Sequence, residues 1–311
     1  MSIIKYKEYL ERLNEVVKDK EVVLIPHKNP DVDAIISCVL LSKLLDFLNI
    51  LNSIRIYDEK ISKDTSNLLS SIGINPDKYK KDESEAKNSD NLILLDHYET
   101  NLKGKVLAII DHHYTNKKIK AKTHIYEPTC SASYIVYKLI EEASMQITKE
   151  IANLVVYASM VDTSCFKSTK SIKSEEDEIM KLISDFSLDG DEIINKSLML
   201  TNLSEMTVEE IAANGCKEYN FNQNKVFSSY IQVKNQEAEY FVPDILIYIL
   251  NRMQDLEIKL WVFIIFDFER EDTQIYYVKG QKIESELKKG ILSRGKDIIP
   301  KIEEEFNKKG N

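Results

Sequence analysis

The sequence predicts an α/β protein with an N-terminal doubly wound parallel sheet and a smaller C-terminal α/β domain. Three short apolar runs, "EVVLIP" (21–26), "NLILL" (91–95) and "KVLAII" (105–110), are rich in β-branched residues and bounded by polar turns, as buried parallel strands are. Helical patterns separate these runs, and strands that alternate with helices favour βαβ units. The length of 311 residues exceeds one ordinary core and fits about two domains.

The remaining elements follow from the same patterns. The expected helices of the first part cover residues 33–48, 62–71, 131–143 and 149–160, after a surface helix at the N-terminus. The Gly and Asp residues of "SLDGDE" predict a linker at about 188–192, between a first domain at 1–188 and a second at 193–311. In the second domain we expect strands in "KVFSSYIQV", "LWVFIIFDFE" and "TQIYYVKG", and helices near 207–219, 242–255 and 280–291.

The composition is that of a folded globular protein and excludes several functional classes. No apolar run reaches the roughly 18 residues of a membrane span, and the N-terminus lacks the pattern of a signal peptide. We therefore expect a cytoplasmic protein with no membrane partner. The four cysteines are scattered without a C-x-x-C pair, which argues against zinc-ribbon and redox sites. The net charge of −9 argues against an extended nucleic-acid partner but leaves room for a small anionic substrate.

Acidic and imidazole side chains follow each apolar run. They are His27, Asp31 and Asp33 after the first run, Asp96 and His97 after the second, Asp111, His112 and His113 after the third, and Asp162 after "IANLVVYASMV". Each residue alone has a structural explanation, such as a helix N-cap for Asp31 or Asp33. These separate explanations do not account for all four runs ending alike. Because ligands bind beyond the carboxyl ends of parallel strands, we expect the side chains to converge on one edge.

Clustered carboxylates repel one another, and divalent cations relieve that repulsion. Mixed His and Asp ligands without Cys suit manganese or cobalt, with magnesium and zinc as alternatives. The number of side chains is sufficient for two metals that share one bridging carboxylate. Two such metals lower the pKa of a shared water and stabilise an in-line displacement at phosphorus. The residues themselves therefore predict a two-metal phosphohydrolase.

The motifs "PHKNPDVD", "LLDHYE", "IIDHH", "VDTSCFKS" and "SRGKDIIP" resemble those of the DHH phosphoesterase superfamily. The resemblance is strongest to the manganese-dependent (family II) inorganic pyrophosphatases and runs through almost the whole chain after the N-terminal helix. It implies hydrolysis of pyrophosphate or short polyphosphate by a metal-bridging hydroxide, with two metal ions, Mn²⁺ or alternatively Co²⁺ or Mg²⁺, as cofactors. It also implies a small phosphorylated substrate as the partner and a homodimer.

The same resemblance implies a role for each matching residue. His27 and Asp31 would hold one metal, Asp33, His112 and Asp162 would hold the other, and Asp96 would bridge the two. Asp111 would orient its neighbours, and His113 would contact the substrate phosphate. Arg294 and Lys296 would neutralise the leaving phosphate, and Lys167 is a further candidate for substrate contact. His97 is a candidate for orienting or acid chemistry.

Several positions depart from the family pattern. Gly295 stands where a lysine is expected, Glu205 or Met206 stands near an expected phosphate-binding lysine, and Tyr98 and Pro26 replace an asparagine and a glycine. Two alternatives therefore stay open. One is a phosphodiesterase acting on short oligonucleotides or cyclic dinucleotides, with Tyr98 and Tyr114 as base-stacking candidates. The other is a metal-binding regulatory protein without turnover.

Overall fold

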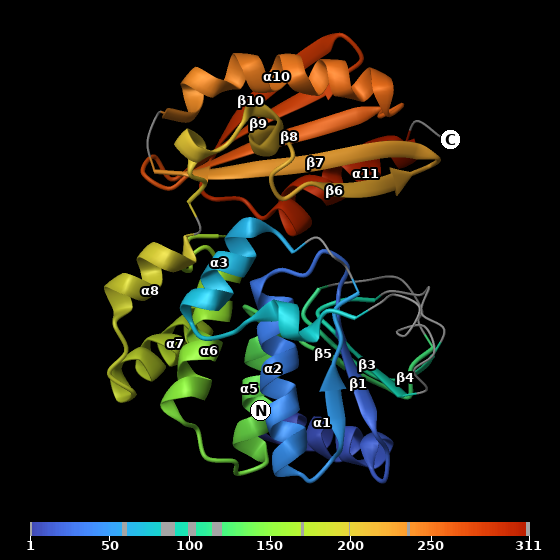
Figure 1. Cartoon of the computed structure of the whole chain (residues 1–311), viewed down its shortest axis with the longest axis vertical. Coiled ribbons are helices and arrows are strands. Elements are labelled where there is room, and N and C mark those ends of the chain that lie inside the picture. The colour runs from blue at the N-terminus through green and yellow to red at the C-terminus, as the bar shows by residue number, and fades with distance from the viewer. Residues whose placement is uncertain are drawn as a thin grey trace. The chain divides into compact units, whose positions relative to one another are not determined.

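The computed structural model describes residues 2–57, 61–81, 91–98, 104–113, 120–168, 171–198, 200–234 and 237–308. The chain divides into two compact units (Figure 1). The first comprises Met1–Cys165 and Ser171–Ser197, and the second comprises Phe166–Lys170 and Leu198–Asn311. A short segment of the second unit therefore interrupts the first unit in the sequence.

The first unit contains a five-stranded parallel sheet in the order β2-β1-β3-β4-β5. Its strands are β1 (Val22–Pro26), β2 (Asn52–Ile54), β3 (Asn91–Leu95), β4 (Lys105–Asp111) and β5 (Thr123–Tyr126). β1, β3 and most of β4 are buried, which explains their continuous apolar sequences. The strand order changes direction between β1 and β3, and open α/β sheets bind ligands beyond such a switch point.

Seven helices of the first unit lie within the described residues. They are α1 (Ser2–Val17), α2 (Val32–Phe47), α3 (Lys63–Ser71), α5 (Ala132–Glu142), α6 (Lys149–Asp162), α7 (Lys173–Asp185) and α8 (Gly190–Ser197), with a 3₁₀ turn η1 (Pro76–Tyr79). α2 is the central helix, because it packs against the sheet as well as against α5 and α6 (Figure 1). Burial on nearly all sides explains its almost wholly apolar sequence.

The second unit contains a mixed sheet in the order β10-β9-β8-β7-β6, in which only β7 and β8 are parallel among the described pairs. The strands are β6 (Lys217–Phe221), β7 (Asn224–Val233), β8 (Leu260–Asp267), β9 (Asp272–Lys279) and β10 (Lys282–Lys289). The other elements are η2 (Leu203–Glu205), α9 (Val208–Ala212), α10 (Glu237–Asp255), a π-helical turn η3 (Arg294–Ile298) and α11 (Ile299–Lys308). α10 covers one face of the sheet around a core that includes Trp261 and Phe263 (Figure 1).

The parallel sheet of the first part and the α/β architecture of the second confirm the predicted fold class. Two predicted helices are wrong. Residues 282–289 form strand β10, because pairing with β9 overrides the helix propensity of its Lys, Glu and Leu residues. The helix predicted at 207–219 ends at Ala212, because the chain turns through Asn214 and Gly215, whose φ is 57°.

The second change of unit lies at Ser197/Leu198 instead of at residues 188–192. Asp191 and Glu192 belong to the first turn of α8. Acidic side chains stabilise the N-terminal end of a helix, so the acidic sequence that predicts a linker begins a helix here.

Candidate metal centre

The connection between β1 and α2 carries the first polar side chains. His27 follows β1, and Asp31 caps α2 by accepting a hydrogen bond from the backbone N–H of Ala34 at 3.2 Å. The carboxylate of Asp31 also reaches His27, since its Oδ2 lies 3.4 Å from Nε2 of the ring. The helix cap therefore fixes the carboxylate beside the imidazole, and the two explanations of Asp31 hold together.

Asp33 lies in the first turn of α2 and is 2% exposed. Its carboxylate accepts hydrogen bonds from the backbone N–H groups of Ala132 at 2.7 Å and Ser133 at 2.9 Å, at the start of α5. A helix N-terminus favours a negative charge, so these two bonds hold Asp33 in one position.

Asp96 follows β3 and occupies the centre of the cluster. Its φ of 65° is left-handed, and its backbone N–H donates to the carbonyl oxygen of Ile110 at 2.9 Å. The two carboxylate oxygens point to different histidines. Oδ2 lies 3.6 Å from Nε2 of His27, and Oδ1 lies 3.4 Å from Nε2 of His112. A strained backbone at such a position is typical of a functional site.

His112 follows β4 and is almost completely buried. Its Nε2 lies 3.5 Å from Oδ2 of Asp162, the last residue of α6, and 4.0 Å from Oδ2 of Asp33. Its Nδ1 lies 2.9 Å from the carbonyl oxygen of Thr129. We assign the proton to Nδ1, because a carbonyl oxygen accepts it there. The lone pair of Nε2 then faces the carboxylates, as in a metal-binding histidine.

The structure brings all six predicted metal ligands together. Three groups have donor atoms within 4.8 Å of one another: His27, Asp31 and Asp96; Asp33, His112 and Asp162; and Asp96, His112 and His113. The first two groups coincide with the two ligand sets that the resemblance implies. Asp96 belongs to the first group and also lies against His112 of the second.

Asp111 and His113 form a pair at the end of β4. Oδ1 of Asp111, which is fully buried, accepts a hydrogen bond from the backbone N–H of His113 at 2.9 Å and lies 3.0 Å from its Nδ1. Nδ1 of His113 also lies 3.2 Å from Oδ1 of Asp96. The side chain of His113 is 41% exposed, so a buried acid holds a ring that solvent reaches.

The charges in this cluster influence one another strongly. Burial, followed by the charge of Asp96, raises the pKa of Asp33 to about 7. Burial alone would also raise the pKa of Asp96, but the imidazoles of His113 and His112 hold it well below its ordinary value. Burial and the charge of His113 lower the pKa of His112, yet the carboxylates of Asp162 and Asp96 raise it overall.

Buried polar atoms at the cluster test whether the side chains suit a metal. Among the described residues, Oδ1 of Asp96, Oδ2 of Asp111 and Nε2 of His112 are buried without a hydrogen bond of normal geometry. Buried polar atoms ordinarily have partners. Carboxylate oxygens and neutral imidazole nitrogens that face one another suit divalent metals of intermediate hardness, so the donor set fits two such ions.

Other residues singled out in the sequence lie outside this cluster. His97 is buried, and its Nε2 lies 3.0 Å from the carbonyl oxygen of Ile25, so it ties β3 to β1. Tyr98 packs against the apolar face of the sheet, and its ring centroid lies 6.4 Å from that of His124. Tyr114 lies outside the described residues.

The predicted substrate cations belong to the second unit. Nη1 of Arg294 donates to the carbonyl oxygens of Gly215 and Ser228. Lys296 is exposed in the same π-helical turn. Lys167 forms an ion pair with Glu271 at 2.8 Å, so a local partner already accounts for its charge. Glu205 is exposed in η2.

Lys217 is a cation that the sequence analysis missed. It pairs with Ser228 across β6 and β7, so both side chains lie on the same face of the sheet. Tyr230, two residues further along β7, lies on that face too, and its ring is 4.9 Å from Cζ of Arg294. Lys217 and Arg294 therefore share one face. The error in the predicted helix at 207–219 concealed this pairing.

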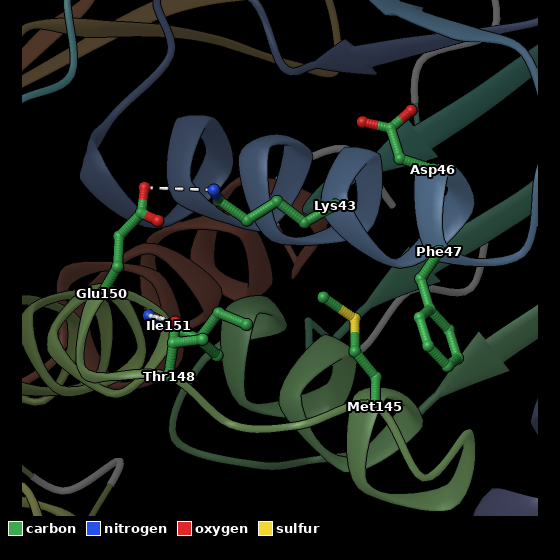
Figure 2. A pocket seen from close by; sticks show the side chains of 7 residues that line it. All are labelled: Lys43, Asp46, Phe47, Met145, Thr148, Glu150 and Ile151. Carbon is green, nitrogen blue, oxygen red and sulfur yellow. Dashed lines mark hydrogen bonds and ion pairs between the residues drawn. The ribbon is translucent and has the colours of Figure 1, made fainter.

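The first unit also has a surface pocket of about 420 Å³ (Figure 2). Phe47 and Met145 line it, and an ion pair between Lys43 and Glu150, 3.0 Å long, crosses one side. It lies at the C-terminal end of α2, whereas Asp33 lies at the N-terminal end of that helix. The pocket is therefore separate from the metal centre.

Residues 21–159 match the DHH family, N-terminal domain. A "Probable manganese-dependent inorganic pyrophosphatase" of Bacillus mycoides is 26% identical, over 92% of this chain and 99% of its own. A "Manganese-dependent inorganic pyrophosphatase" of Methanocaldococcus jannaschii is also 26% identical, over 91% and 99%. A crystal structure from Methanococcus jannaschii, named for family II inorganic pyrophosphatases, has a TM-score of 0.72 at 24% identity, over 93% of this chain and 100% of its own.

Proposed function

We propose that this chain, whose residues 21–159 form an N-terminal domain of the DHH family, is a two-metal hydrolase that cleaves inorganic pyrophosphate or short polyphosphate to phosphate. The observation that carries the proposal is the position of Asp96, whose two oxygens face His27 on one side and His112 on the other. The names of its relatives, which the chain matches over nearly their full length, support pyrophosphate as the substrate.

In this proposal, His27, Asp31 and Asp96 hold one divalent metal, and Asp33, His112, Asp162 and Asp96 hold the other. Manganese is the metal that the relatives' names support. When bound, the metals lower the pKa of a water molecule and neutralise phosphate charge. The protein fixes the donor atoms beforehand through the helix N-terminus at Asp33 and the carbonyl oxygens at His27 and His112.

The remaining groups act on the substrate. Asp111 orients the ring of His113, which donates a hydrogen bond to a phosphate oxygen. The guanidinium of Arg294 and the ammonium groups of Lys296 and Lys217 neutralise the phosphate that leaves. Lys217 supplies a positive charge in place of those that Gly295 and Glu205 lack. Lys167 has the weakest claim, because it pairs with Glu271.

The alternative functions have less support. The phosphodiesterase hypothesis needs aromatic rings that stack with bases, and Tyr98 instead packs against the sheet and His124. A regulatory protein without turnover does not explain why Asp111 orients His113 in addition to the clustered ligands. Within the described residues, no helix is long and apolar enough to cross a membrane. The cytoplasmic location and the homodimer remain part of the proposal, and light scattering tests the latter.

The deciding experiment measures phosphate release with manganese present. Pyrophosphate and tripolyphosphate are compared with a dinucleotide, whose cleavage is followed by chromatography. Faster turnover of pyrophosphate or tripolyphosphate than of the dinucleotide would support the proposal. Preferential cleavage of the dinucleotide would favour the phosphodiesterase, and inactivity on all three despite bound metal would favour the regulatory protein.

A further inference from the structure

Arg294 lies in a cradle formed by β7 and the turn before β6. Its Nη1 donates to the carbonyl oxygens of Gly215 and Ser228, and its Cζ lies 4.9 Å from the centre of the Tyr230 ring. A guanidinium has five donors in a planar fork. Here one nitrogen is bound to the protein backbone and one face rests on an aromatic ring, so the plane of the fork is set.

The ring of Tyr230 fits only because residue 215 is glycine. A Cβ atom built on Gly215 would lie 2.4 Å from Cε1 and 2.9 Å from Cδ1 of Tyr230, much closer than van der Waals contact. The φ of Gly215 is also left-handed, at 57°. Any other residue here would push the ring away and strain the backbone. Gly215 thus supplies both a carbonyl acceptor for Arg294 and the space for the ring beneath it.

Independent contacts hold the two halves of the cradle together. The backbone N–H of Tyr230 donates to the carbonyl oxygen of Asn214 at 3.0 Å, and the amide of Asn214 donates to the carbonyl oxygen of Tyr230, also at 3.0 Å. The ring of Tyr230 packs against Phe266, with centroids 5.6 Å apart. These contacts fix the ring whether or not Arg294 is present.

We propose that Tyr230 and Gly215 are positioning residues that hold the guanidinium of Arg294 ready for a phosphate group of the substrate. The proposal rests on the proposed function, in which Arg294 binds that phosphate. A charged side chain that is ordered before binding loses less conformational freedom when the ligand arrives. The ring and the two carbonyls confer this order, and the substrate then meets the nitrogens of the fork that face away from Gly215.

The first test compares Tyr230→Leu, which removes the ring, with Tyr230→Phe, which keeps it. Tyr276→Leu is the matched control, because Tyr276 packs with the core on the opposite side of the same sheet. In the manganese-loaded enzyme, we expect Tyr230→Leu to raise KM for pyrophosphate by about 3- to 30-fold with metal content unchanged. Tyr230→Phe and Tyr276→Leu should stay within about twofold of the wild type.

A double-mutant comparison separates positioning from general damage to the fold. In the Arg294→Ala background, Tyr230→Leu should raise KM no further, since no guanidinium remains to be held. An effect of equal size in both backgrounds would overturn the proposal. An unchanged KM in Tyr230→Leu alone would also overturn it.

The cradle can be tested without any activity. In protein with labelled arginine, the ring current of Tyr230 should shift the side-chain NMR signal of Arg294, which Arg294→Ala identifies. The shift should persist in Tyr230→Phe and disappear in Tyr230→Leu; a signal that is the same in both variants would overturn the cradle. If the wild-type enzyme hydrolyses no pyrophosphate but the shift behaves as expected, the proposed function fails while the cradle stands.

Discussion

Oδ1 of Asp96 lies 3.4 Å from Nε2 of His112, although the two residues follow different strands and both are buried. The other oxygen of Asp96 faces His27, at the end of a third strand. One carboxylate thus joins side chains from the ends of β1, β3 and β4. This arrangement arises because the strand order places β3 between β1 and β4.

Asp96→Asn should remove the bridging charge while keeping the size of the side chain. We expect hydrolysis to fall by more than roughly 100-fold, since even residues that only orient metal ligands contribute 10- to 100-fold. Mass spectrometry of the metals should find less than the wild-type content, and circular dichroism should find a folded protein. Substantial residual turnover with full metal content would refute the bridging role of Asp96.

Metal binding should release protons below about pH 7. The pKa of Asp33 is raised to about 7, chiefly by burial, and carboxylates raise the pKa of His112 despite burial. A metal must displace these protons, so metal affinity should increase as pH rises through 7 and then level off. Calorimetry at pH 6 in two buffers of different ionisation enthalpy measures the released protons, and identical heats in both would contradict this assignment.

The raised pKa of Asp33 also has a consequence for the metal-free protein. Between pH 4 and 7 the folded state retains a proton on Asp33 that the unfolded state, with an ordinary pKa of 3.8, has lost. The contribution of this group to stability therefore falls as pH rises through that window. Added manganese should reverse the trend, which thermal melts with and without the metal would show.

Asp111→Asn should weaken the orientation of His113 and leave the metal ligands in place. Oδ1 of Asp111 lies 3.0 Å from Nδ1 of His113, and the substitution replaces a charged acceptor by a neutral amide. We expect kcat to fall by about 10- to 100-fold with nearly full metal content. Loss of metal in this variant would assign Asp111 to the metal site instead.

Arg294→Ala should raise KM for pyrophosphate or lower kcat without changing the metal content, because its side chain belongs to the second unit and the metal ligands belong to the first. Arg294→Lys should recover only part of the loss, since lysine cannot present two parallel donors to a phosphate. Metal analysis beside steady-state kinetics checks both points. Reduced metal content in Arg294→Ala would show that the second unit contributes to the metal centre.

Lys217→Ala should raise KM for pyrophosphate by roughly 3- to 30-fold, in keeping with loss of one charge-assisted hydrogen bond. Lys225→Ala is a matched control from the same hairpin. Lys225 lies on the opposite face, where it contacts Glu218 and the ring of Phe227. Equal effects of the two substitutions would mean that general charge, not the position of Lys217, matters.

Much of the metal centre could be predicted from the sequence, because each ligand directly follows a strand or helix with a clear hydrophobic pattern. The βαβ pattern requires parallel strands, and parallel strands bring their carboxyl ends to one edge. His27, Asp96 and His112 therefore had to approach one another. The role of Asp33 as an acceptor at the start of α5 had no sequence signal, since Ala132 and Ser133 lie about 100 residues away.

The second unit was less predictable. The sequence of β10 favours a helix by composition, and only pairing with β9 makes it a strand. The same kind of long-range pairing, between β6 and β7, places Lys217 on the face of Arg294. A local pattern cannot reveal which residues meet across two strands when one of the strands has been mistaken for a helix.

The sequence by itself determined the parallel sheet, the converging carboxylates and imidazoles, and hence the two-metal chemistry, because hydrophobic periodicity fixes where strands end. Only the tertiary structure decided how Asp96 divides its oxygens between two histidines and how Gly215 and Tyr230 hold Arg294. Those arrangements depend on distances between segments far apart in the chain, which packing sets and local sequence does not encode.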